Sequence, residues 1–147
     1  MVVGIIAVLA GILGYALGIL RSQPPGDILA VLPAHEATSS AYEAYRHEKP
    51  EVAIWALEQA ASKMTALVGL NVDSPWYTRE DLNYDLMLTH ARIAQLYESL
   101  RDQRSEDHFI AAVRYGKHVY PTEHVDRARL LALLDTHNTF EVGGKGK

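Results

Sequence analysis

The sequence predicts an all-α protein in which one transmembrane helix precedes a stack of four to five antiparallel helices. Two observations support this. Residues 2–20 form an uncharged apolar run, and the rest of the chain places apolar residues at helical spacing between breaks that contain proline or glycine. No stretch shows the alternation and the β-branched enrichment that are typical of strands, so we expect no sheet.

The apolar run over residues 2–20 has the length and composition of a membrane-spanning helix. It contains only Val, Ile, Leu, Ala and Gly apart from Tyr15. At about 1.5 Å per residue, such a helix spans close to the ~30 Å hydrocarbon layer of a bilayer. We therefore interpret residues 1–21 as a transmembrane anchor. The alternative is a cleaved secretory signal, but no basic residue precedes the run, and the run is longer than the apolar part of most signals.

Arg21 directly follows the run, and no basic side chain precedes it. By the positive-inside tendency, this favours a single-pass protein of the cell membrane with its helical domain in the cytoplasm. Within the run, Ala10, Gly14 and Gly18 recur at four-residue spacing. Such a face lets another helix approach closely, so we predict that it packs on a partner's helix or on a second copy. The alternative is that glycine is simply common in membrane helices.

The remaining chain divides into a linker, a helical domain and a tail. Residues 22–33 are interpreted as the linker, because two prolines and a glycine open it and a third proline closes it. The domain covers residues 34–138, and residues 139–147 form a flexible, glycine-rich tail. The expected helices occupy residues 34–47, 51–68, 75 or 78 to 100, 105–119 and 122–137.

Local signals mark several of these helix ends. Pro50 suits the first turn of the second helix, and Gly69 suits the position after its end. Thr78 with Asp81 resembles a capping box at the start of the third helix. That third helix carries two apolar stripes, so we expect it to be the central element. The second helix also has two stripes, one with Val52 and Trp55 and the other with residues Ile54, Leu57, Ala61, Met64 and Leu67.

Part of this pattern resembles the tetratricopeptide repeat. His90, Ile93-Ala94 and Tyr97 are spaced like the large residue, the Leu-Gly pair and the Tyr of that repeat. Residues 100–103 resemble the turn between its two helices, and residues 50–58 resemble its second helix. The chain departs from the family in having His90 in place of Trp, and in lacking a regular period of about 34 residues. The resemblance implies tetratricopeptide-like hairpins that bind protein along a helical surface.

The layout is similar to that of the lipopolysaccharide assembly protein B family, in which a membrane helix precedes cytoplasmic helical repeats. That family also carries a cysteine-ligated metal module, and this chain contains no cysteine. The similarity is therefore one of topology. It implies a protein-binding role at a membrane and says nothing about chemistry.

Composition argues against several classes of function. Without cysteine, the chain cannot form disulfides, thiolate metal sites or cysteine nucleophiles. A net charge of −4 offers no basic field for nucleic acid. Neither a phosphate-binding glycine loop nor a Gly-x-Ser-x-Gly elbow is present. We expect no enzymatic activity and no small-molecule cofactor.

A metal-dependent enzyme is the alternative from a different class, because the chain contains seven histidines. Glu43 and His47 could share a helix face, and His118 and His124 flank a proline break. Two ligands without a third make a poor metal site. The paired acidic residues are interpreted as helix caps because they lie at predicted helix N-termini. We therefore expect no metal site and no catalytic residue.

Aromatic residues give the sharper functional hypothesis. Most are expected in the core, but Trp76 and Tyr77 lie at a loop-to-helix junction, where they would anchor a partner or the lipid interface. We predict a membrane-anchored adaptor that binds other membrane or membrane-associated proteins. The alternative is a small accessory subunit of a larger membrane complex, held there by the face of Ala10, Gly14 and Gly18.

Overall fold

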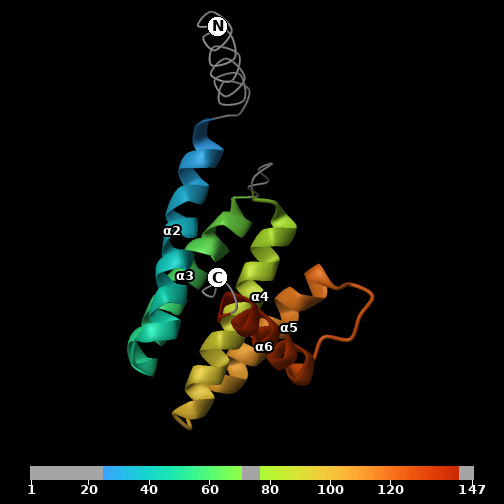
Figure 1. The fold of residues 1–147 in the computed structure, drawn as a ribbon. Coiled ribbons are helices and arrows are strands. Elements are labelled where there is room, and N and C mark those ends of the chain that lie inside the picture. The colour runs from blue at the N-terminus through green and yellow to red at the C-terminus, as the bar shows by residue number, and fades with distance from the viewer. Residues whose placement is uncertain (1–24, 71–76, 143–147) are drawn as a thin grey trace, which may run out of the picture.

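The computed structural model describes residues 25–70 and 77–142 (Figure 1). In these ranges the secondary structure consists of five α-helices and no strand, which confirms the all-α prediction for this part of the chain. The helices are α2 (Pro25–His47), α3 (Pro50–Gly69), α4 (Arg79–Ser99), α5 (Arg104–Val119) and α6 (Arg127–Val142).

The predicted membrane anchor cannot be compared with this structure. Residues 1–21, with the small side chains of Ala10, Gly14 and Gly18, lie outside the described ranges. Within those ranges, no helix combines the length and the apolar character that a bilayer crossing requires.

The helices form two antiparallel hairpins and a final helix, an arrangement compatible with a helical repeat (Figure 1). A two-residue turn joins α2 to α3, and a four-residue turn joins α4 to α5. The first hairpin packs on the second through α3 and α4, while α6 packs on α4 and α5. The central position expected for the third predicted helix is therefore confirmed for α4.

The core lies along α4 and is built from the apolar stripes of its neighbours. From α3, the stripe of Ile54, Leu57 and Met64 is buried, as predicted. The largest fully buried side chains of α4 and α6 are those of Leu82, Leu86, Met87, Ile93, Leu130 and Leu134. Burial of these side chains is the main stabilising contribution, because it removes apolar surface from water on three sides of one helix.

The capping box predicted for the third helix is confirmed at the start of α4. The Thr78 hydroxyl accepts a hydrogen bond from the Asp81 backbone N–H at 3.1 Å, and the Asp81 carboxylate accepts one from the Thr78 N–H at 2.9 Å. The two hydrogen bonds from Thr78 lower the pKa of the Asp81 carboxyl. Of the two starts that the sequence leaves open, residues 75 and 78, the structure has the one that the capping box marks.

The linker predicted over residues 22–33 is wrong from Pro25 onward, because α2 begins there and Pro33 lies inside it. A proline inside a helix removes one backbone hydrogen bond. The following turns compensate by packing, since Ala34 and Ala41 are buried against the bundle. The Thr38 hydroxyl also donates to the Ala34 carbonyl at 2.8 Å.

The last predicted helix and the tail also need correction. Instead of residues 122–137, α6 covers Arg127–Val142, so the tail predicted from residue 139 is helical through Val142. The reason is a cap at Asp126, whose carboxylate accepts from the Arg129 N–H at 2.9 Å and whose carbonyl accepts from Leu130 at 3.0 Å. At the end of α3, Gly69 is the last helical residue, with Leu70 in a right-handed cap.

Candidate partner-binding groove

A groove lies between α3 and α5, which both pack on α4 rather than on each other. We call it the α3–α5 groove. Two adjoining hollows of about 230 and 310 Å³ form it, and they meet at Glu58. The side chains of α3 that are not buried are Glu51, Trp55, Glu58, Ser62 and Thr65, and the buried Ile54 and Ala61 lie behind them. Helix α4 contributes His90, Ile93 and Tyr97, its C-cap contributes Leu100, and α5 contributes Arg104 and His108.

The α3 wall is a single helical stripe that faces away from the core. Its five members follow one another at alternating spacings of four and three residues, which places them on one face of the helix. Trp55 is the largest of them, and 65% of its surface is exposed. Exposed tryptophan is unusual in a small domain and common at binding surfaces. The stripe therefore presents an aromatic side chain between two carboxylates.

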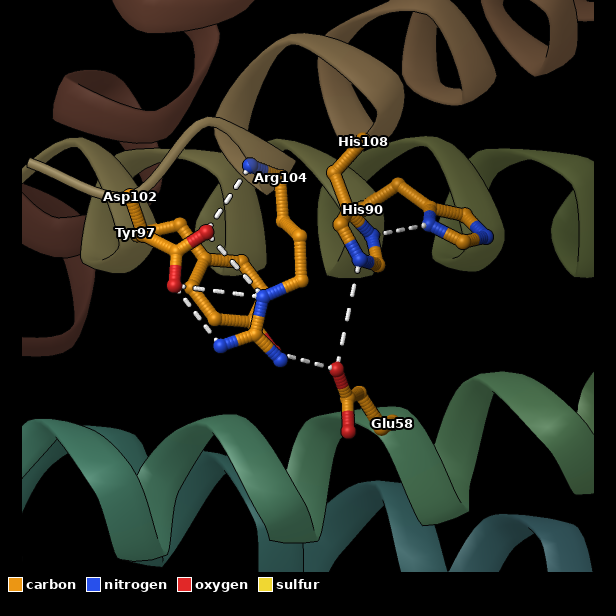
Figure 2. A network of polar contacts seen from close by, with 6 residues as sticks. All are labelled: Glu58, His90, Tyr97, Asp102, Arg104 and His108. Carbon is orange, nitrogen blue, oxygen red and sulfur yellow. Dashed lines mark hydrogen bonds and ion pairs between the residues drawn. The ribbon is translucent and has the colours of Figure 1, made fainter.

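Glu58 is held in place by side chains of α4 and α5 on the other side of the groove (Figure 2). The Tyr97 hydroxyl donates to Glu58 Oε1 at 2.7 Å, and His108 Nε2 lies 4.0 Å from the same oxygen. Burial and the hydrogen bond to Glu58 raise the pKa of Tyr97 to about 12, so the phenol stays a donor. Among the described residues, none donates to the other carboxylate oxygen, which leaves it available to a ligand.

Arg104 at the start of α5 is neutralised by its neighbour (Figure 2). Its Nε and Nη2 donate to the Asp102 carboxylate at 3.0 and 2.7 Å, and its guanidinium lies 4.2 Å from the centre of the Tyr97 ring. These hydrogen bonds lower the pKa of Asp102 to about 2. The pair therefore adds no net charge, and the groove keeps the negative charges of Glu51 and Glu58.

Two histidines meet at the inner end of the groove. His90 Nδ1 and His108 Nδ1 are 3.0 Å apart, so one ring donates and the other accepts (Figure 2). His90 also stacks on Tyr115, with 5.6 Å between ring centres. Burial, with smaller contributions from His108 and Arg114, lowers the pKa of His90 to about 4, and burial lowers the pKa of His108. Both rings are therefore neutral at pH 7.

Of the predicted anchor pair, Trp76 and Tyr77, the structure describes only Tyr77. Trp76 lies outside the described residues, and Tyr77 is half-buried at the start of α4, where its ring packs against the core. The Tyr77 hydroxyl donates to Asp85 Oδ2 at 2.7 Å and lies 3.7 Å from the Met64 sulfur. Burial and the neighbouring Asp85 raise its pKa. A partner contact through these two residues stays a prediction, and Tyr77 is not among the residues that line the groove.

The residue pairs considered for metal binding lie on the surface. His47 Nε2 is 3.5 Å from Glu43 Oε2, so the two share a helix face as predicted. His124 Nε2 lies 3.6 Å from Asp126 Oδ2. Across residues 25–70 and 77–142, no group of three or more His, Cys, Asp or Glu side chains could hold a metal ion.

A second polar cluster joins α2 to α4 and has a structural role. Arg92 is only 3% exposed, and its guanidinium lies 4.1 Å from the centre of the Tyr42 ring. The Tyr45 hydroxyl donates to the Gln95 side chain at 2.9 Å. Stacking on an aromatic ring partly offsets the loss of water around the guanidinium. This cluster therefore contributes to the packing of the first hairpin on the second.

No family model matches the chain, and neither a curated protein nor a solved structure is similar to it.

The groove contains residues that the helical periodicity of the sequence places in an apolar stripe. Trp55 was assigned to an apolar stripe of α3, together with Val52, yet both are exposed. The signal that distinguishes the two stripes was present: Glu51 and Glu58 flank Trp55 on its own face, whereas the buried stripe carries only apolar residues. The contacts between Glu58, Tyr97 and His108 join distant parts of the chain and have no local signature.

Proposed function

We propose that this protein is a membrane-tethered adaptor whose α3–α5 groove binds another protein. The observation that carries the proposal is Trp55, a large aromatic side chain that is 65% exposed in a groove instead of in the core. Aromatic anchors of this kind dominate the energetics of protein interfaces. Helical surfaces with shallow grooves also suit the binding of extended or helical segments.

The membrane tether rests on the sequence alone. The uncharged run over residues 2–20 supports it, because its length and apolar composition fit a bilayer. The tether places the groove close to the membrane surface, where a partner that is itself membrane-associated is concentrated. Effective concentration then allows a groove of modest affinity to retain its partner.

The test is retention of partners by the full chain. The tagged protein is purified in mild detergent from the membranes in which it is naturally produced, and the accompanying proteins are quantified by mass spectrometry. Trp55→Ala should lose its main partner while keeping its helical content. Ile110→Ala is the matched control, since Ile110 on α5 is 60% exposed and lies outside the groove. Equal retention by wild type and Trp55→Ala would contradict the proposal.

The second candidate is an accessory subunit of a larger membrane complex. The four-residue spacing of Ala10, Gly14 and Gly18 favours it, because small residues at that spacing let membrane helices pack closely. Replacing Gly14 and Gly18 together by Leu distinguishes the two candidates. A subunit held through its membrane helix dissociates from the complex, whereas an adaptor keeps its groove-bound partner and remains in the membrane fraction.

A further inference from the structure

We propose that the α3–α5 groove recognises a cationic side chain, arginine or lysine, on a segment of its protein partner. The cation lies on the exposed indole of Trp55, between the carboxylates of Glu51 and Glu58. This inference rests on the proposed function of the groove as a partner-binding surface and specifies the chemistry of the segment that it binds.

The spacing along α3 creates the arrangement. Glu51 and Glu58 lie four residues before and three residues after Trp55, which puts each carboxylate about one turn from the indole on the same face. The exposed face of the tryptophan is attractive to cations, and more so than that of tyrosine or phenylalanine. A guanidinium or ammonium on the ring can therefore reach a carboxylate on either side.

The neighbouring residues accommodate the rest of such a side chain. The exposed Leu100 lines the same hollow and offers apolar surface to the methylene stem of an arginine or lysine. Beyond Glu58 the groove becomes uncharged and more apolar, with Ala61 and Ile93 beside the hydroxyls of Ser62 and Thr65 and the neutral histidine pair. Only the Trp55 end combines an aromatic face with negative charge.

The charges of the groove exclude other ligand chemistries. Arg104 lines the same hollow and attracts Glu58, but it is paired with Asp102, and its single charge is outnumbered by the carboxylates of Glu51, Glu58 and Asp102. An acidic segment would therefore meet a surface of net negative charge. A purely apolar segment would remove water from both carboxylates and give nothing in return. Within the described part of the chain, Glu51 forms no ion pair, and Glu58 accepts only a neutral phenol at hydrogen-bond distance. A cation on Trp55 would interact favourably with the carboxylates of both Glu51 and Glu58.

The experiment compares two peptides that differ only in charge. Fluorescently labelled, end-blocked nonapeptides carry a central Leu-Arg-Leu or Leu-citrulline-Leu, since citrulline keeps the shape of arginine without its charge. Binding to the full chain in mild, uncharged detergent is measured by anisotropy. We expect the arginine peptide to bind at least tenfold more tightly than the citrulline peptide. The double variant Glu51→Gln/Glu58→Gln should abolish that difference.

A matched control separates local recognition from net charge. Glu36→Gln/Glu48→Gln removes two exposed carboxylates of the first hairpin that lie outside the groove and should leave the tenfold preference intact. Equal binding of the two peptides, or no binding of the arginine peptide at millimolar concentration, would overturn the inference. Either result leaves the proposed function to be decided separately, by partner retention in Trp55→Ala. Loss of the preference in the control double variant would show attraction by overall charge and would also overturn it.

Discussion

His90 provides a quantitative prediction, because it is a histidine that the fold keeps neutral. Its ring is buried at the inner end of the α3–α5 groove, bonded to His108 and stacked on Tyr115. These surroundings lower its pKa to about 4, compared with about 6.5 in an unfolded chain. We therefore predict that the protein loses stability on mild acidification, and that His90→Gln, which does not titrate, reduces this loss.

The direction and the size of this stability change follow from proton linkage. Between pH 6.5 and pH 4, the unfolded chain binds a proton at His90 that the folded protein excludes, so stability falls as the pH falls through this window. Above pH 6.5 the neutral ring contributes fully, and below pH 4 both states are protonated and the loss is complete. The difference between the two pKa values corresponds to about 3 kcal/mol.

The assay is urea unfolding of the full chain in mild detergent, followed by circular dichroism at a series of pH values from 7 to 4. The wild-type free energy of unfolding should fall more steeply than that of His90→Gln, with the two curves separating by about 3 kcal/mol across the window. Parallel curves would refute the reasoning. So would a direct titration by nuclear magnetic resonance that places the pKa of the His90 ring near 6.5 in the folded protein.

Three further predictions concern the folding of the helices, and each is measured by thermal or urea unfolding. Gly116→Ala should destabilise the protein by about 1–2 kcal/mol, because the new methyl would lie 2.7 Å from Val125 Cγ1 in a buried contact. Gly69→Ala, which has open space around it, should instead stabilise the protein by about 0.5–1 kcal/mol. A stabilising effect of Gly116→Ala would show that the buried contact relaxes. Arg101→Gly should stabilise by about 0.5–1 kcal/mol, because Arg101 has φ 57° in the turn after α4 and only glycine adopts this conformation without strain; a destabilised variant would contradict this. Asp126→Ala should cost about 1 kcal/mol through loss of the α6 cap, and an unchanged midpoint would mean that the cap is not needed.

The fold was predictable where local chemistry and periodicity agree. The apolar stripe of α3 and the capping box of Thr78 gave helix positions that match the structure. The failures are at positions where packing outweighs a local signal. Pro33 reads as a helix end, yet burial of Ala34 and Ala41 keeps α2 continuous across it. For the last helix, Pro121 predicts a start at residue 122, but α6 begins at Arg127, directly after the cap at Asp126.

The candidate site was less predictable, because its contacts join residues that are distant in sequence. The Glu58 carboxylate meets Tyr97 from the next hairpin, and His90 meets His108 across the α4–α5 turn. Neither pair has a spacing that a single sequence could reveal. Trp55 was the residue that could have been found, because acidic neighbours on its own helix face are incompatible with the core.

The most direct measurement of the central claim is site-specific photo-cross-linking in the membranes in which the protein is naturally produced. A photoreactive amino acid replaces Ser62, an exposed residue of the α3–α5 groove, or Lys117, an exposed residue of α5 outside it. We predict that the Ser62 position yields a discrete cross-linked partner and that Trp55→Ala removes it, while the Lys117 position yields none. A partner captured at Lys117 and absent at Ser62 would contradict the assignment of the groove as the binding surface.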